Sequence, residues 1–92
     1  MTFSPGPRMA EPRYKLSGGA AALPGTRVLV GAGGRSVELL DVPLGTTRPV
    51  APLEGVASFA TVTLLPDGRA VILGGYDDDI DLTRLALVVD TE

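Results

Sequence analysis

The sequence predicts an all-β protein made of two antiparallel sheets, the first with four strands and the second with three. Three observations support this fold class. A stretch at 23–34, which begins with Leu-Pro and ends in Gly-Gly, returns at 65–75, with Arg27 and Arg69 lying 42 positions apart. Twelve glycines and eight prolines among 92 residues are too many for a helical protein. The apolar runs between the turns are short, as in buried strands.

The first half of the chain is predicted to contain an arm followed by one repeat. Residues 1–13 hold three prolines and one glycine, so we expect an extended N-terminal arm. The first repeat is expected to occupy 14–52. Its strands are predicted at 15–23, 27–32, 36–42 and 47–52. Prolines confine the last of these strands to the edge of its sheet.

The second repeat, predicted at 53–92, follows the same order but lacks a fourth strand. Strands are expected at 56–65, 70–73 and 82–89. The sequence Pro66-Asp67-Gly68 predicts a tight hairpin, because proline presets its own φ and glycine accepts a positive φ. A stripe of apolar residues within 82–89 also allows a short C-terminal helix as an alternative.

Several of these motifs resemble kelch-type, galactose-oxidase-like propeller blades over residues 9–90. The resemblance is carried by residues 9–14, by the Leu-Pro…Arg turn, by the apolar strand ending in Gly-Gly, and by 36–41 with the turn at 44–46. It implies two kelch-like propeller blades, the second incomplete, in a superfamily whose kelch-type members are mostly binding scaffolds. The chain departs from the pattern, since Leu40 stands where such blades usually have tyrosine and tryptophan is absent. Two blades are also fewer than the four to eight of a propeller.

Composition excludes most catalytic chemistry. The chain has no histidine and no cysteine, so copper and zinc sites and Ser-His-Asp or Cys-His arrangements cannot form. A pair of carboxylates for glycoside cleavage is not placed by anything in the sequence. Instead, we expect Glu38 to point outward from its strand and Asp41 to begin a turn. The sequence therefore predicts a protein without enzymatic activity.

The acidic run at 77–81 is the one candidate metal site. Asp77, Asp79 and Asp81 alternate along the chain, and such carboxylates can converge on calcium. Leu82 and Val88 occupy the sixth and twelfth places, where an EF-hand loop needs glycine and glutamate. A solvated loop that discourages edge-to-edge aggregation is the preferred interpretation, and calcium is the alternative.

The charge distribution and the first residues bear on the partners and the localisation of the chain. The net charge is −3 and the basic residues are scattered, so we expect no nucleic-acid partner. The first residues lack the basic and apolar regions of a secretion signal, and no apolar run approaches the roughly 18 residues of a membrane helix. We expect a soluble chain with no membrane partner. Its compartment stays undetermined, with the cytoplasm favoured.

These expectations favour a protein-binding or scaffolding module. An exposed apolar sheet face calls for a partner, so we expect either a homo-oligomer that closes a ring or further propeller blades. In a homo-oligomer, the arm at 3–13 could supply the missing fourth strand of a neighbour. The alternative is a fragment of a larger propeller enzyme or carbohydrate-binding protein whose active residues lie elsewhere. Four surface arginines are candidates for partner contacts: Arg13, Arg35, Arg48 and Arg69. The simpler interpretation is that Arg27 and Arg69 brace the hairpin turns that they follow.

Overall fold

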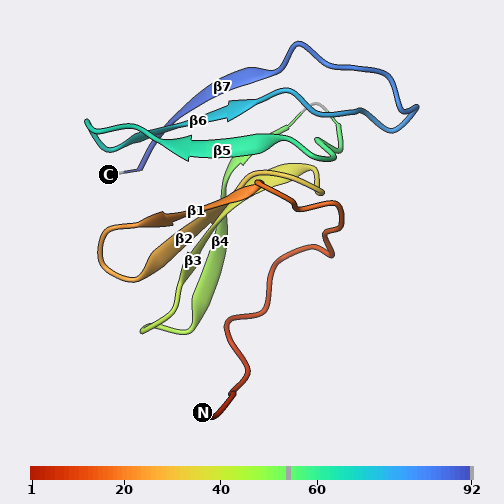
Figure 1. Ribbon diagram of the computed structural model, residues 1–92. Coiled ribbons are helices and arrows are strands. Elements are labelled where there is room, and N and C mark those ends of the chain that lie inside the picture. The colour runs from red at the N-terminus through yellow and green to blue at the C-terminus, as the bar shows by residue number, and fades with distance from the viewer. Residues whose placement is uncertain (54, 92) are drawn as a thin grey trace.

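The computed structural model describes residues 1–53 and 55–91, and the predicted all-β fold class is confirmed (Figure 1). Two antiparallel sheets of four and three strands are present, and the described part of the chain contains no helix. The first sheet contains, in spatial order, β1 (Ala20–Leu23), β2 (Arg27–Val30), β3 (Ser36–Asp41) and β4 (Thr46–Pro52). The second contains β5 (Thr61–Leu64), β6 (Arg69–Leu73) and β7 (Ala86–Asp90). Glu54 and Glu92, which fall in the predicted second repeat, lie outside the described residues.

Tight turns join the strands where the sequence places proline and glycine. The Leu65 amide donates to the Arg69 carbonyl at 2.7 Å, and Gly68 has a φ of +90°. The Asp67 carboxylate accepts hydrogen bonds from the Arg69 amide at 3.1 Å and from its guanidinium at 2.8 Å. The predicted Pro-Asp-Gly hairpin is therefore confirmed, and Arg69 braces the turn that it follows.

Five strands are shorter than predicted, and backbone geometry explains the shortening of the two predicted at 15–23 and 56–65. Lys15 and Phe59 have φ values of +56° and +62°, which break the extended backbone early in the predicted strands 15–23 and 56–65. Residues 82–85 form a loop that leads into β7, and the alternative helix does not form. The strand cores nevertheless lie within the predicted segments.

The strand registers show that the two sheets follow the same plan. Leu29 lies opposite Leu39 in the first sheet, and Val71, 42 positions after Leu29, lies opposite Val88 in the second. We call the side of each sheet that carries these pairs its front face, and the other side its back face.

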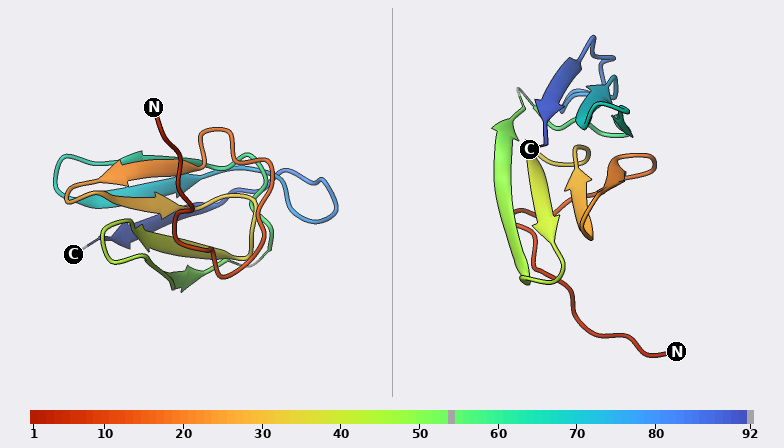
Figure 2. Two further views of the ribbon diagram at one scale, coloured as in Figure 1. Left: turned by 90° about the horizontal axis from the view of Figure 1, so that it is seen from below. Right: turned by 90° about the vertical axis from the view of Figure 1, so that its left-hand side faces the viewer.

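The hydrophobic core lies between the front face of the first sheet and the back face of the second (Figure 2). Leu29 and Leu39 enter it from the first sheet, and Val62 and Ile72 enter it from the second. Gly31 allows this close approach, because a Cβ atom there would lie 2.7 Å from Cδ1 of Ile72. The two repeats therefore stack front to back.

The N-terminal segment crosses the back face of the first sheet before it reaches β1 (Figures 1 and 2). The Thr47 hydroxyl on β4 donates to the Arg8 carbonyl at 2.7 Å. Residues 1–7 extend beyond this contact, away from the second sheet (Figure 1). The segment is thus bound to the sheet at 8–13 and free at 1–7.

Candidate functional site

The back face of the first sheet holds a buried ion pair. Glu38 lies on β3 and Arg13 belongs to the arm, and both side chains are 0% exposed. Nη2 of Arg13 lies 2.8 Å from Oε2 of Glu38, and Nε donates to the same oxygen at 2.9 Å. The guanidinium also donates to the carbonyls of Ala32 at 3.1 Å and Ser36 at 2.6 Å. Oε1 of Glu38 accepts the Ala10 amide at 2.6 Å, so both charges are paired and hydrogen-bonded.

Two predictions about this pair are wrong. Glu38 does not point outward into solvent, and Arg13 is not a surface arginine. Strand alternation does put Glu38 on the opposite side from Leu39, but the arm covers that side. Asp41 begins a turn as predicted, because its carboxylate accepts the Leu44 amide at 3.1 Å.

Glu11 fastens the end of the arm to the loop between β2 and β3. Its carboxylate accepts the Arg35 amide and the Ser36 hydroxyl, both at 2.6 Å. The hydrogen bond from Ser36, followed by the Arg35 amide bond and the charges of Arg13 and Arg35, lowers the pKa of Glu11 below its ordinary value. Burial opposes this change. The ionised form of Glu11 is therefore the form that holds the arm.

The three aspartates of the candidate calcium site lie close together. One carboxylate oxygen from each of Asp77, Asp79 and Asp81 falls within 4.8 Å of the others. Oδ1 of Asp77, however, already accepts the amides of Asp79 and Asp81, each at 2.9 Å. Asp79 and Asp81 are exposed. The arrangement is that of a loop held by its own backbone, and calcium binding stays a prediction.

Asp78, the remaining aspartate of the loop, connects the two repeats. It forms an ion pair with Arg35 of the first repeat, and its other oxygen accepts the Val56 amide at 3.2 Å. The Arg35 hydrogen bond is the main reason that the pKa of Asp78 lies below its ordinary value. Sequence reasoning missed this contact, since the two residues are 43 positions apart and no motif joins them.

The front face of the second sheet is open to solvent. Val88 is 55% exposed and Leu73 is 46% exposed, while Val71 is half-buried. The threonines of β5 at 61 and 63 extend the same face and are exposed. No described segment crosses it as the arm crosses the first sheet (Figure 1). The exposed valines and leucine of this face distinguish the second repeat from the first, whose equivalent residues Leu29 and Leu39 are buried.

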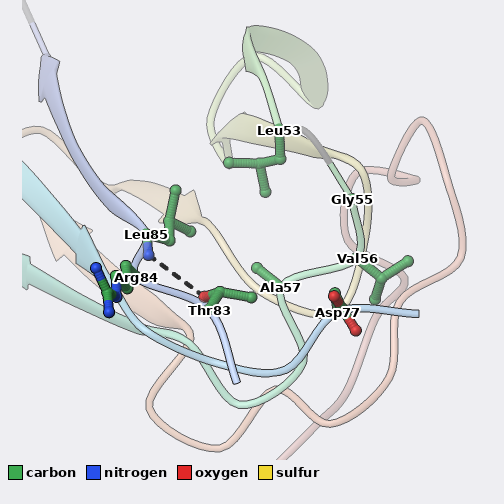
Figure 3. A pocket seen from close by; sticks show the side chains of 8 residues that line it. All are labelled: Leu53, Gly55, Val56, Ala57, Asp77, Thr83, Arg84 and Leu85. Atoms are coloured by element: carbon green, nitrogen blue, oxygen red, sulfur yellow. Dashed lines mark hydrogen bonds between the residues drawn. The ribbon is translucent and has the colours of Figure 1, made fainter. Parts of the chain in front are cut away.

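Two cavities lie between β4 with its following residues and β7 with its preceding residues. The first, of about 430 Å³, is lined by Leu53 and residues 55–57 on one side and by Asp77 and residues 83–85 on the other. Figure 3 shows Leu53, Leu85 and Ala57 around this space. The second, of about 270 Å³, lies between residues 48–50 and 89–91. Together they mark a groove along one edge of the second sheet.

Comparisons with known proteins identify no relative: no protein family, curated protein or solved structure matches this chain. Among the described residues, no helix is long and apolar enough to cross a membrane.

Proposed function

We propose that this chain is a non-enzymatic protein-binding module built from two kelch-like propeller blades, and that it is completed by a further antiparallel sheet. That sheet comes from a second copy of the chain or from additional repeats. One observation supports this most strongly: Val71 and Val88 occupy the repeat positions of Leu29 and Leu39, which are buried between the sheets. The open front face therefore has the same plan as a face that already binds a sheet.

The energetics favour coverage of this face. Full burial of a valine or leucine side chain contributes roughly 1.5–3 kcal/mol relative to exposure. Val71, Leu73 and Val88 lie together on adjacent strands, so one partner can cover all three. A sheet whose back face carries small and β-branched residues fits best, since the core already shows that packing at Val62 and Ile72.

Sedimentation analysis over a concentration series tests this proposal. The unaltered chain is expected to associate, and Val71→Glu, which puts a charge in the middle of the front face, is expected to be monomeric. Leu44→Glu is the matched control, because Leu44 is 74% exposed in the β3–β4 turn and lies away from this face. Val71→Glu and Leu44→Glu behaving alike would contradict docking of a second copy at the face.

Additional repeats are tested by a tandem duplication in which a second copy of 14–92 follows the first. Each new front-to-back interface should raise the free energy of unfolding, since repeat arrays gain stability from contacts between neighbours. Val71→Glu in the first copy should remove that gain, whereas Leu44→Glu should keep it. A duplication that unfolds like the single chain would contradict this form of the proposal.

A further inference from the structure

The outer edge of β7 pairs with no other described strand at Ala86 and Val88. Within the β6–β7 ladder, the Gly74 amide donates to the Leu85 carbonyl at 2.9 Å. This bond sets the phase of the ladder, so the odd-numbered residues of β7 bond to β6. Ala86 and Val88 therefore direct their amide and carbonyl groups to the open edge. The equivalent strand of the first sheet, β3, is instead paired with β4 along its length.

The groove beside this edge can hold side chains from an added strand. Leu53, Val56 and Leu85 line its larger cavity. Val50 and Val89 line the smaller one, with the charged Arg48 and Asp90 beside them. Backbone groups at the edge and apolar side chains in the groove together suit an extended segment, which would gain main-chain hydrogen bonds and apolar burial at once.

The strand β4 shows what such a segment can contain. In the first sheet, the Gly31 amide donates to the Gly19 carbonyl at 2.8 Å, so the odd-numbered residues of β2 bond to β1 and its even-numbered residues bond to β3. The even-numbered residues of β3 lie opposite these, which leaves its odd-numbered residues to bond to β4. Pro49 and Pro52 lie opposite even-numbered residues of β3, where no amide is needed. An outer strand of this protein therefore tolerates proline in the non-bonding phase.

Residues 1–7 have the same arrangement and are free. Every odd position is apolar or proline, and every even position has an amide: Met1, Phe3, Pro5 and Pro7 alternate with Thr2, Ser4 and Gly6. The Phe3 side chain is 91% exposed. If Pro5 and Pro7 take positions that do not hydrogen-bond to β7, the even-numbered residues form the hydrogen bonds to its edge. The odd-numbered residues then lie opposite odd-numbered residues of β7 and share their side, which faces the groove.

We propose that residues 1–7 of a second copy of this chain bind in the groove and add an antiparallel fourth strand to β7. Ser4 pairs with Val88 at the edge, and Phe3 lies opposite Val89 on the groove side. A second copy is required because residues 1–7 of the same chain leave the first sheet on its back face, pointing away from β7 (Figures 1 and 2). The inference rests on the self-association in the proposed function and names the segment that carries it.

Residues 8–13 do not take part in this exchange. They are bound to their own first sheet through Arg13 and Ala10, both of which contact Glu38. This limits the predicted strand donor, which the sequence placed at 3–13, to the part of the arm before Arg8. Seven extended residues span about 23 Å, which exceeds the length of about 17 Å of the five-residue strand β7.

Light scattering and amide hydrogen exchange on the full chain test the exchange. Phe3→Asp is expected to weaken association at least tenfold and to remove protection of the Val88 amide. It cannot disturb folding directly, since Phe3 is exposed. Val88→Pro, which deletes the edge amide but no bond to β6, should weaken association to the same degree. Ser4→Asp is the control, because it adds the same charge on the side away from the groove, opposite the uncharged Val88.

The outcomes separate this inference from the proposed face contact. Loss of association in Phe3→Asp and Val88→Pro, with Val71→Glu unchanged, supports arm exchange and counts against the face. Loss in Val71→Glu alone overturns arm exchange. A monomeric chain overturns it as well, even if Phe3→Asp exposes the Val88 amide, because that result places residues 1–7 in their own groove.

Discussion

The two sheets of this protein repeat one plan but treat their remaining faces differently. The back face of the first sheet is covered by the arm and holds the Arg13–Glu38 pair, with both side chains 0% exposed. At the position equivalent to Glu38, the second sheet has Leu87, which packs against the first sheet. The back face of the first sheet thus has a charged residue, Glu38, where it contacts the arm. The back face of the second sheet has Leu87 at the equivalent position, where it contacts the other sheet.

The comparison extends to the outer strands. The first sheet has β4 beyond β3, whereas among the described residues no strand pairs with β7 on its outer side. Its front face is also bare. The first repeat is therefore self-contained apart from the core it shares, while the second presents both a face and an edge. Any binding function that uses the fold itself is expected to reside on the second repeat.

The largest expected effect comes from breaking the ion pair that distinguishes the first back face. Glu38→Ala leaves the Arg13 charge buried and unpaired, so we expect a loss of about 3–5 kcal/mol in the free energy of unfolding. Urea denaturation measures it. The double variant Arg13→Met with Glu38→Leu makes this face resemble that of the second sheet and should lose less than Glu38→Ala. A double variant at least as unstable as Glu38→Ala would refute the comparison.

A smaller effect separates two glycines that are 41 positions apart in the repeat. Gly33 and Gly74 both have a φ of +74°. A Cβ at Gly33 would lie 1.9 Å from the Tyr14 carbonyl oxygen, whereas none of the described atoms lies within 4 Å of one at Gly74. Gly74→Ala should cost about 1–2 kcal/mol from the backbone alone, and Gly33→Ala about 3 kcal/mol or more. Equal losses in denaturation would show that Tyr14 does not pack tightly against the loop that contains Gly33.

The smallest expected effect is acid release of the arm. The folded chain lowers the pKa of Glu11, chiefly through the Ser36 hydroxyl. Its contribution is therefore complete above the unfolded value of about 4.3 and is lost as the pH falls through the lower folded value. The protection factor of the Arg35 amide against hydrogen exchange should fall as the pH drops below the ordinary pKa of a glutamate, and Ser36→Ala should shift that fall to higher pH. Asp67→Asn, which alters the β5–β6 turn, is the control and should leave the Arg35 amide unchanged.

The sequence was sufficient for the features that depend on neighbouring residues. Pro66-Asp67-Gly68 closes its hairpin, and the apolar runs form the strands, because turn geometry and alternation are local properties. The same alternation assigned Glu38 to the correct face of β3. It could not show what covers that face, since Arg13 lies 25 positions away and no periodic pattern connects them. The Arg35–Asp78 contact, across 43 positions, was unpredictable for the same reason.

The candidate site was predictable only in outline. The sequence placed three aspartates at alternate positions, and their oxygens do lie near one another. It could not show that one carboxylate oxygen of Asp77 accepts two backbone amides of the loop, because that depends on the path of the loop. Nor could it distinguish the covered face of the first sheet from the bare face of the second.

The front-to-back contact across Gly31 also has a symmetry consequence. Contact between unlike faces of equivalent units is heterologous, so no two-fold axis relates them, and the operation can be repeated. If the operation is a pure rotation, the repeats form a closed ring, and the number of repeats in it is a full turn divided by the rotation angle. If the operation also includes a shift along the axis, the repeats form an open superhelix. A Cβ added at Gly31 would lie only 2.7 Å from Cδ1 of Ile72, so this glycine determines how closely the sheets approach. The distance between the sheets in turn determines the operation that relates the repeats. One interface within a 92-residue chain therefore defines the handedness and pitch of any array built from it.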